Sequence, residues 1–266
     1  MKCWATVLGH CEGKQSKEHY MSRGLWKGRT IKVRGFSWLK GKDREIGIGS
    51  FQSRILCERH NHELSPLDAE AQKLLETLEQ IIRNLRTNAP FKSRAAYRKP
   101  KTWHVDGLKV ERWAAKFLVG LVCAEEAGAK WHDSRSRALE PPAWVVQAIF
   151  DHGEFRRPAG LYFATSYQAD LVGGLGIGPL SHPVSEEIVG GDISFGGFRF
   201  VIWLTHDPME SFSIPPPTGV VSNLNESDLK YRLELMRFPI GNVVNQKLVF
   251  HWDPVPQTTS SPMAAK

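Results

Sequence analysis

An α+β fold is predicted for this chain of 266 residues by three observations. Cys and His residues cluster in the first 60 residues, where Gly, Lys and Arg are frequent and long periodic runs are few. Apolar residues recur at helical spacing from residue 65 onward, and from residue 160 they form short runs between Gly and Pro clusters. We therefore expect an N-terminal metal-stabilised module (1–90) and an α+β domain (91–266). The latter should be helical over 104–150, β-rich and mostly antiparallel over 160–253, and disordered over 254–266.

The N-terminal module is expected from two pairs of ligand-type residues. Cys57 and His60 are separated by two residues, so a tight turn can bring both side chains to one metal. Cys3 and Cys11 lie upstream, and the four together make a candidate tetrahedral Zn²⁺ site. A variant in which His10 replaces Cys3 is geometrically open, and ordinary buried thiols are the alternative. So short a segment buries little apolar surface, and a structural Zn²⁺ would supply the missing stability.

The helical part of the chain has clear start signals. Ser65-Pro66-Leu67-Asp68 places a capping hydroxyl, a proline at the first helical position and an acid at the third, so a helix should run from Ser65 to about Arg86. A second helix is expected over roughly 108–127, with Asp106 as its cap, and a shorter one after Pro141-Pro142.

Strands are expected where the apolar period changes. The runs are Leu161–Phe163, Glu187–Val189, Phe198–Leu204 and Leu248–Trp252. The Gly-rich segment 173–178 leads into Pro179 and not into a helix, so it does not fit a phosphate-cradling loop. We expect it to be a flexible loop or hairpin connection.

Charge is distributed unevenly along the chain. The sequence pI is about 9.3 and the net charge is +7. Residues 1–100 carry 20 Lys and Arg against 10 Asp and Glu, whereas residues 101–266 carry 15 against 18. A basic N-terminal part is what binding to nucleic acid needs, and a solvated basic surface is the plainer alternative. The sequence contains neither an apolar run long enough to span a membrane nor a signal-peptide pattern, so we expect no membrane association and a cytoplasmic location, where thiols stay reduced.

The metal motif resembles a known family. Cys3 and Cys11 are followed by Ser16-Lys17-Glu18-His19, and Leu56-Cys57-Glu58-Arg59-His60-Asn61 leads into a helix. This arrangement is similar to the zinc-containing branch of the HNH endonucleases, which have the ββα-metal fold. The similarity covers about the first 70 residues.

The resemblance implies roles for three residues. His19 would be the general base that activates water, Glu18 would bind a catalytic Mg²⁺ or Mn²⁺, and Asn61 would be the ligand from the helix, with His62 as the alternative to Asn61. Phosphodiester hydrolysis needs such a base and such a cation. Basic residues near the motif are expected to hold backbone phosphates: Lys14, Lys17, Arg23, Arg54 and Arg59.

The sequence thus leads to a function hypothesis with alternatives. We expect an HNH-type endonuclease acting on DNA rather than RNA, with a role in restriction or phage defence, and with a protein partner contacting the C-terminal domain. The alternatives are a non-catalytic zinc-stabilised module that binds nucleic acid, and a structural or interaction protein.

Overall fold

The computed structural model describes part of the chain in detail. The described residues are 3–19, 30–36, 39–88, 101–124, 131, 140–152, 155–156, 159–167, 174–181, 187–195, 198–205, 235–240 and 243–252. Of the predicted features, Arg23, the tail 254–266 and residues 125–127 of the second helix lie outside these ranges.

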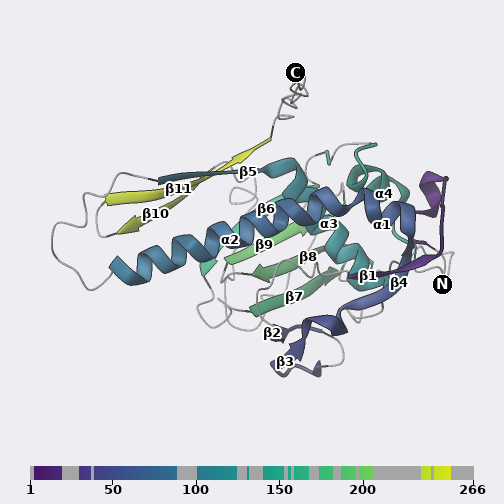
Figure 1. Ribbon diagram of the computed structural model, residues 1–266, viewed down its shortest axis with the longest axis horizontal. Helices are drawn as coiled ribbons and strands as arrows, with labels where there is room; N and C mark the ends of the chain where they lie inside the picture. Colours follow the sequence, from purple (N-terminus) through teal and green to yellow (C-terminus); the bar gives the residue numbers. More distant parts are fainter. Residues whose placement is uncertain are drawn as a thin grey trace, which may run out of the picture.

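Most of the helices lie in the middle of the chain and most of the strands in its N-terminal and C-terminal parts, so the fold is mixed α+β (Figure 1). In the N-terminal part the elements are η1 (Thr6–Leu8), β1 (Gln15–His19), β2 (Thr30–Arg34), β3 (Arg44–Gly47), η4 (Ile48–Ser50), β4 (Gln52–Cys57), α1 (Glu58–Glu63) and α2 (Ser65–Asn88). They are followed by β5 (Lys101–Asp106), α3 (Gly107–Cys123), α4 (Ala143–Ile149), β6 (Gly160–Tyr167), β7 (Gly174–Ser181), β8 (Ile188–Phe195), β9 (Phe198–Trp203), β10 (Leu235–Ile240) and β11 (Val243–His251).

The strands form three sheets. β1 and β4 make an antiparallel pair, β10, β11 and β5 make a three-stranded sheet, and the third sheet has the order β3-β2-β7-β8-β9-β6. Among the described strands, six of the eight pairings are antiparallel, so the prediction of mostly antiparallel β structure is confirmed. The pairings β2–β7 and β11–β5 are parallel, which makes two of the sheets mixed. Because β2 lies beside β7, residues from the predicted N-terminal module share a sheet with the C-terminal strands. The division at residue 90 stays a prediction.

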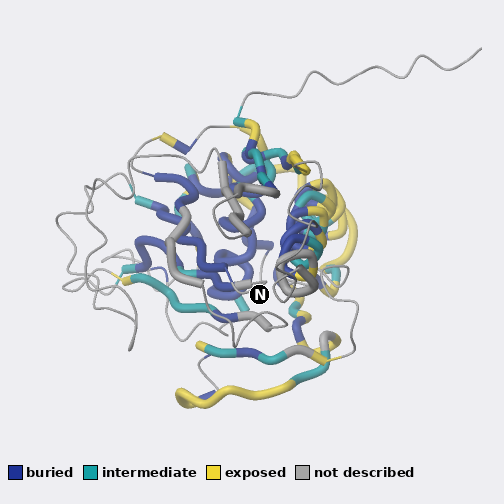
Figure 2. The backbone as a smooth tube through the Cα atoms, turned by 90° about the vertical axis from the view of Figure 1, so that its left-hand side faces the viewer, coloured by how far each residue is buried: buried dark blue, intermediate teal, exposed yellow. Residues whose placement is uncertain are grey.

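Helix α3 is the central element of the core. Fourteen of its residues are buried, and it contacts helices α2 and α4 and strands of both larger sheets, β6, β8 and β9 of one and β5 and β11 of the other. The helix approaches β8 closely, because a Cβ added at Gly191 would lie 2.9 Å from Leu118 Cδ1 and the leucine side chain would have to shift. Figure 2 shows the buried residues gathered in the interior and the exposed ones along the outer side of the helical layer.

The predicted helix starts are confirmed. α2 begins at Ser65. α3 is capped by Asp106, whose Oδ1 accepts a hydrogen bond from the backbone N–H of Lys109 at 3.1 Å. This cap residue also ends β5, which the sequence did not predict; among the described strands β5 pairs with β11, about 140 residues later in the chain.

The prediction for the Gly-rich segment is wrong. Residues 174–181 form β7, which is hydrogen-bonded on both sides, to β2 and to β8. Glycine has a low propensity for strands, and the sequence of this segment therefore does not favour one. The hydrogen bonds to the two neighbouring strands stabilise it as a strand. Among the helices of the described residues, none is both long and apolar enough to span a bilayer.

Candidate metal centre

The strand-to-helix junction β4–α1 positions the Cys-x-x-His pair. Cys57 ends β4 and is the N-cap of α1, where its Sγ accepts from the backbone N–H of His60 at 3.5 Å. The segment before β1 is tied to this junction by two backbone bonds, from Glu58 N to the carbonyl of Lys14 (3.0 Å) and from Arg59 N to the carbonyl of Glu12 (3.4 Å). These bonds bring the turn that contains Cys11 against the start of α1.

The four predicted zinc ligands come together in the structure. The Nδ1 atom of His60 lies 3.3 Å from the Sγ of Cys3, 3.3 Å from that of Cys57 and 3.7 Å from that of Cys11. All four ligand atoms lie within 4.8 Å of one another. The fourth ligand-type residue of this group is Cys3. The alternative site, in which His10 replaces Cys3, is not formed by the described residues.

These separations fit one tetrahedral ion. With Zn–S distances of about 2.3 Å and Zn–N of about 2.0–2.1 Å, the ligand atoms of a tetrahedral site lie roughly 3.5–3.8 Å apart. Three thiols and one imidazole are also a ligand set that Zn²⁺ adopts in structural sites. The group therefore fits a structural Zn²⁺ held by Cys3, Cys11, Cys57 and His60.

Burial sets the ionisation of these ligands. Desolvation lowers the pKa of His60, which favours the neutral imidazole that binds a metal. Burial raises the pKa of the Cys3 thiol to about 12. For Cys57 burial acts in the same direction, but hydrogen bonds from backbone groups and the neighbouring thiols outweigh it, so its pKa is lowered. A bound cation would compensate the negative charge that a buried Cys3 thiolate introduces.

Aromatic packing closes one side of the group. The ring of His60 meets the ring of Phe150 edge-on at 5.3 Å between centroids, and Phe150 lies 5.7 Å from the ring of Trp4. The backbone of Trp4 is held by its main-chain N–H, which donates to the carbonyl of Ile55 in β4 at 3.0 Å. Helix α4, which ends just before Phe150, thus supports the metal ligand from the C-terminal half of the chain.

Glu18, predicted to bind a catalytic cation, is buried in an ion cluster. Its Oε1 lies 2.9 Å from Nζ of Lys116, and the same ammonium lies 2.8 Å from each carboxylate oxygen of Asp68. The side chains of Glu18 and Lys116 are 3% and 2% exposed, while that of Asp68 is 27% exposed. We name these three residues the Lys116 cluster.

Opposing effects act on the ionisable groups of this cluster. Burial raises the pKa of Glu18, and Lys116 works against that rise. For Lys116, burial disfavours the charged form, but the attraction to the carboxylates of Glu18 and Asp68 outweighs burial and raises the pKa of Lys116. The ammonium therefore stays charged and is the cation that contacts Glu18 Oε1.

The other predicted site residues occupy the same module. Asn61 donates from Nδ2 to the hydroxyl of Ser16 at 2.8 Å, which joins α1 to β1. His19 is the last residue of β1 and is paired with Gln52 of β4. His62 lies on α1 and is exposed.

The predicted phosphate-binding residues that the structure describes are exposed. They are Lys14, Lys17, Arg54 and Arg59. Of these, Arg59 donates to Glu63 at 2.9 Å. Their contacts with nucleic acid stay a prediction.

Lys116 is the residue that sequence reasoning missed. A signal was present, because it is the one charged residue in the apolar run from Trp113 to Cys123. A lone lysine at the centre of a buried helix needs a buried partner. The sequence could not name that partner, since Glu18 and Asp68 lie about 100 and 50 residues away along the chain.

No protein-family model, curated protein or solved structure matches this chain. The structure is compatible with a zinc-binding module at the N-terminus. The resemblance to HNH endonucleases rests on the residues of the motif alone.

Proposed function

We propose that this chain is a metal-dependent endonuclease that hydrolyses phosphodiester bonds in DNA, with His19 as its general base. The observation that carries the proposal is the order β1–β4–α1, an antiparallel strand pair followed directly by a helix, with the zinc-type ligands at one end. His19 lies at the other end of β1, about 13 Å along the strand from Gln15, which pairs with Cys57.

The chemistry requires a base and a cation. A neutral imidazole at His19 would accept the proton of the attacking water. A bound Mg²⁺ or Mn²⁺ would offset the charge that develops on the phosphate. Asn61 or His62 from α1 would hold this cation, and Glu18 would do so only after leaving Lys116. The exposed cations Lys14, Lys17, Arg54 and Arg59, with Arg23, would contact the DNA backbone.

A second candidate function is favoured by the Lys116 cluster. Because Glu18 is already paired with a buried ammonium, the module would need no divalent cation at this position. The chain would then be a non-catalytic module, stabilised by zinc, that binds nucleic acid through its basic surface. A protein partner for the C-terminal part is compatible with either function.

Cleavage of supercoiled plasmid in Mg²⁺ or Mn²⁺ tests the proposal. We expect His19→Ala to abolish cleavage while binding to DNA in a gel-shift assay is retained, since removal of a base raises the barrier without changing the phosphate contacts. His104→Ala, at an exposed histidine on β5, is the matched control and should cleave as the wild type does.

Each alternative has its own outcome. Cleavage that survives in His19→Ala would mean that the base is another residue. A wild-type protein that binds DNA but cleaves neither DNA nor RNA with either cation supports the binding module. If cleavage occurs, comparing Asn61→Ala with His62→Ala identifies the ligand, because only its loss should raise the cation concentration that is needed.

A further inference from the structure

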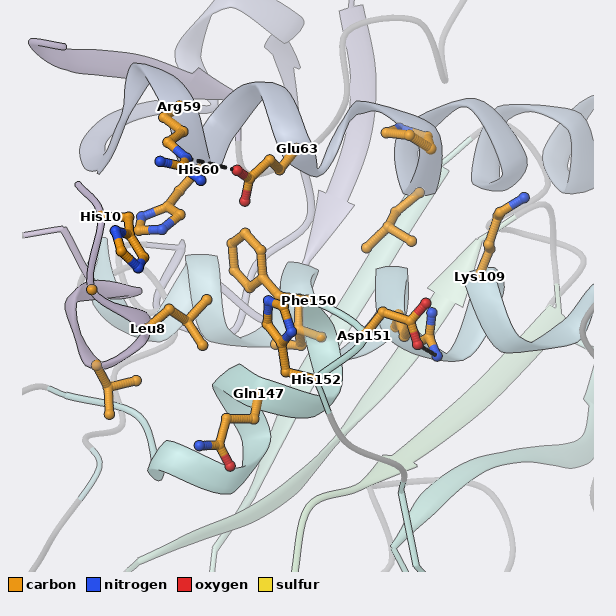
Figure 3. Close-up of a pocket in the computed structure, with 16 residues that line it drawn as sticks. Leu8, His10, Arg59, His60, Glu63, Lys109, Gln147, Phe150, Asp151 and His152 are labelled. Atoms are coloured by element: carbon orange, nitrogen blue, oxygen red, sulfur yellow. Dashed lines mark hydrogen bonds and ion pairs between the residues drawn. The ribbon is translucent and has the colours of Figure 1, made fainter. Parts of the chain in front are cut away.

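A cavity of about 710 Å³ lies beside the metal centre (Figure 3). It is bounded by residues of η1, α1, the start of α2, α3 and α4, with His10 and His60 at one end of the view and Lys109 at the other. Its volume falls in the range of about 300–1,000 Å³ that is typical of sites for small ligands.

One part of the cavity is apolar. Its lining includes Leu8, Leu67 and the half-buried ring of Phe150. Val7, also in the lining, is 53% exposed and is the one exposed large hydrophobic side chain among the described residues. An apolar surface that opens to solvent beside an aromatic ring suits a flat, weakly polar group.

The other part of the cavity is cationic. Lys109 and Arg112 line it together with the carboxylate of Asp151, whereas Arg59 and its partner Glu63 lie nearer His60 (Figure 3). Arg112 donates from Nη2 to Asp151, the ammonium of Lys109 lies 3.1 Å from Asp106 Oδ2, and Arg59 donates from Nε to Glu63. Because a guanidinium has five N–H donors, each of these contacts leaves donors for an anion. Arg–phosphate contacts use such donors in pairs.

Further polar groups also line the cavity. His10 and His152 are exposed imidazoles, and Gln147 carries an amide. Such groups donate and accept hydrogen bonds at the edge of a heterocycle. An apolar ring surface, edge-binding polar groups and cations together match the base and the phosphate of a nucleotide.

We propose that this cavity is a binding site for a mononucleotide. The base packs against Phe150 and Leu8, and the 5′-phosphate is bound by Arg112 and Lys109 of α3. The site lies at the metal-centre end of the β1–β4 pair, whereas His19 lies at the opposite end. It therefore does not depend on the nuclease activity proposed above.

Calorimetric titration of the full, zinc-loaded chain without added Mg²⁺ or Mn²⁺ tests this site. The probes are the four 5′-ribonucleoside monophosphates, the matching nucleosides and inorganic phosphate. At least one monophosphate should bind more tightly than both its nucleoside and inorganic phosphate, because it engages both parts of the cavity. Since no cleavage is measured, an inactive nuclease would leave this result unchanged.

Variants locate the binding. Arg112→Gln and Lys109→Gln should each weaken it by roughly tenfold or more, as the loss of a charge-assisted hydrogen bond does. Arg156→Gln, at an exposed arginine outside the lining, should bind as the wild type does. Lys109→Gln keeps the test valid if Arg112→Gln does not fold, since Lys109 is the more exposed of the two. The proposal is overturned if no monophosphate binds more tightly than inorganic phosphate, or if the folded variants bind like the wild type.

Discussion

Replacement of Lys116 by Met should destabilise the protein strongly. In the wild type its ammonium contacts Glu18 at 2.9 Å and both oxygens of Asp68 at 2.8 Å. Methionine fills a similar volume but leaves the carboxylate of Glu18, which is 3% exposed, without a cation. Breaking a buried ion pair by removing one partner costs about 3–5 kcal/mol. We expect the lower part of this range, because Asp68 is 27% exposed and can be solvated.

The loss should depend on pH. Burial already raises the pKa of Glu18, and Lys116 opposes that rise, so the pKa should be higher still in Lys116→Met. A carboxyl group whose pKa is raised in the folded state binds more protons there than in the unfolded state. Stability then falls as pH rises through the folded pKa, and it recovers on acidification. The difference between wild type and variant should therefore shrink from pH 7 to pH 5.5.

Urea unfolding followed by tryptophan fluorescence measures these differences. The double variant Lys116→Met/Glu18→Gln should regain part of the lost stability, because it removes the buried charge. Lys73→Met is the matched control, since the side chain of Lys73 is 53% exposed where it pairs with Glu70, and it should change stability by no more than about 0.5 kcal/mol. A loss below about 1 kcal/mol for Lys116→Met, or the same loss in the double variant and at both pH values, would refute the reasoning.

Two predictions concern the metal and the basic surface. Protein purified without added metal should contain about one Zn²⁺ per chain. Cys57→Ser should lose this zinc, whereas Cys123→Ser, which changes a thiol outside the ligand group, should keep it. Equal zinc content in the two variants would contradict the assignment. Binding to DNA should weaken with salt, and Lys14→Gln/Lys17→Gln should reduce the slope of log K against log salt by about 1.8, or about 0.9 for each phosphate contact. An unchanged slope would mean that these two exposed lysines do not contact the backbone.

The metal ligands were predictable because the signal is largely local. Cys57 and His60 are three positions apart, and a strand-to-helix turn brings such a pair together without help from distant segments. The start of α2 at Ser65 and the cap of α3 at Asp106 were predictable for the same reason, since a cap is a matter of four consecutive residues.

Long-range pairing was not predictable. β7 is rich in glycine and has little propensity for a strand, but it lies between β2 and β8, and β2 is about 140 residues away along the chain. β5 likewise depends on β11. The partners of Lys116 come from β1 and α2, and no spacing in the sequence relates them. In each case the structure depends on contacts between segments that are distant in the sequence, and the sequence of one segment alone does not predict them.

The metal centre and the Lys116 cluster anchor the β1–β4 pair at two points. A two-stranded sheet is marginally stable by itself. Cys11 precedes β1 and Cys57 ends β4, so a zinc ion held by these residues would fix one end of the pair. Glu18, next to His19 near the other end of β1, is held by Lys116 of α3.

Glu18 can have one of two roles. If His19 is a catalytic base, its position depends on the contact between Glu18 and Lys116, and Glu18 then holds the strand in place. If Glu18 is a ligand for a divalent cation, binding that cation requires Lys116 to withdraw, and β1 then loses the anchor. The cation requirement of any cleavage in Glu18→Gln decides between these two roles, because only a ligand would change it.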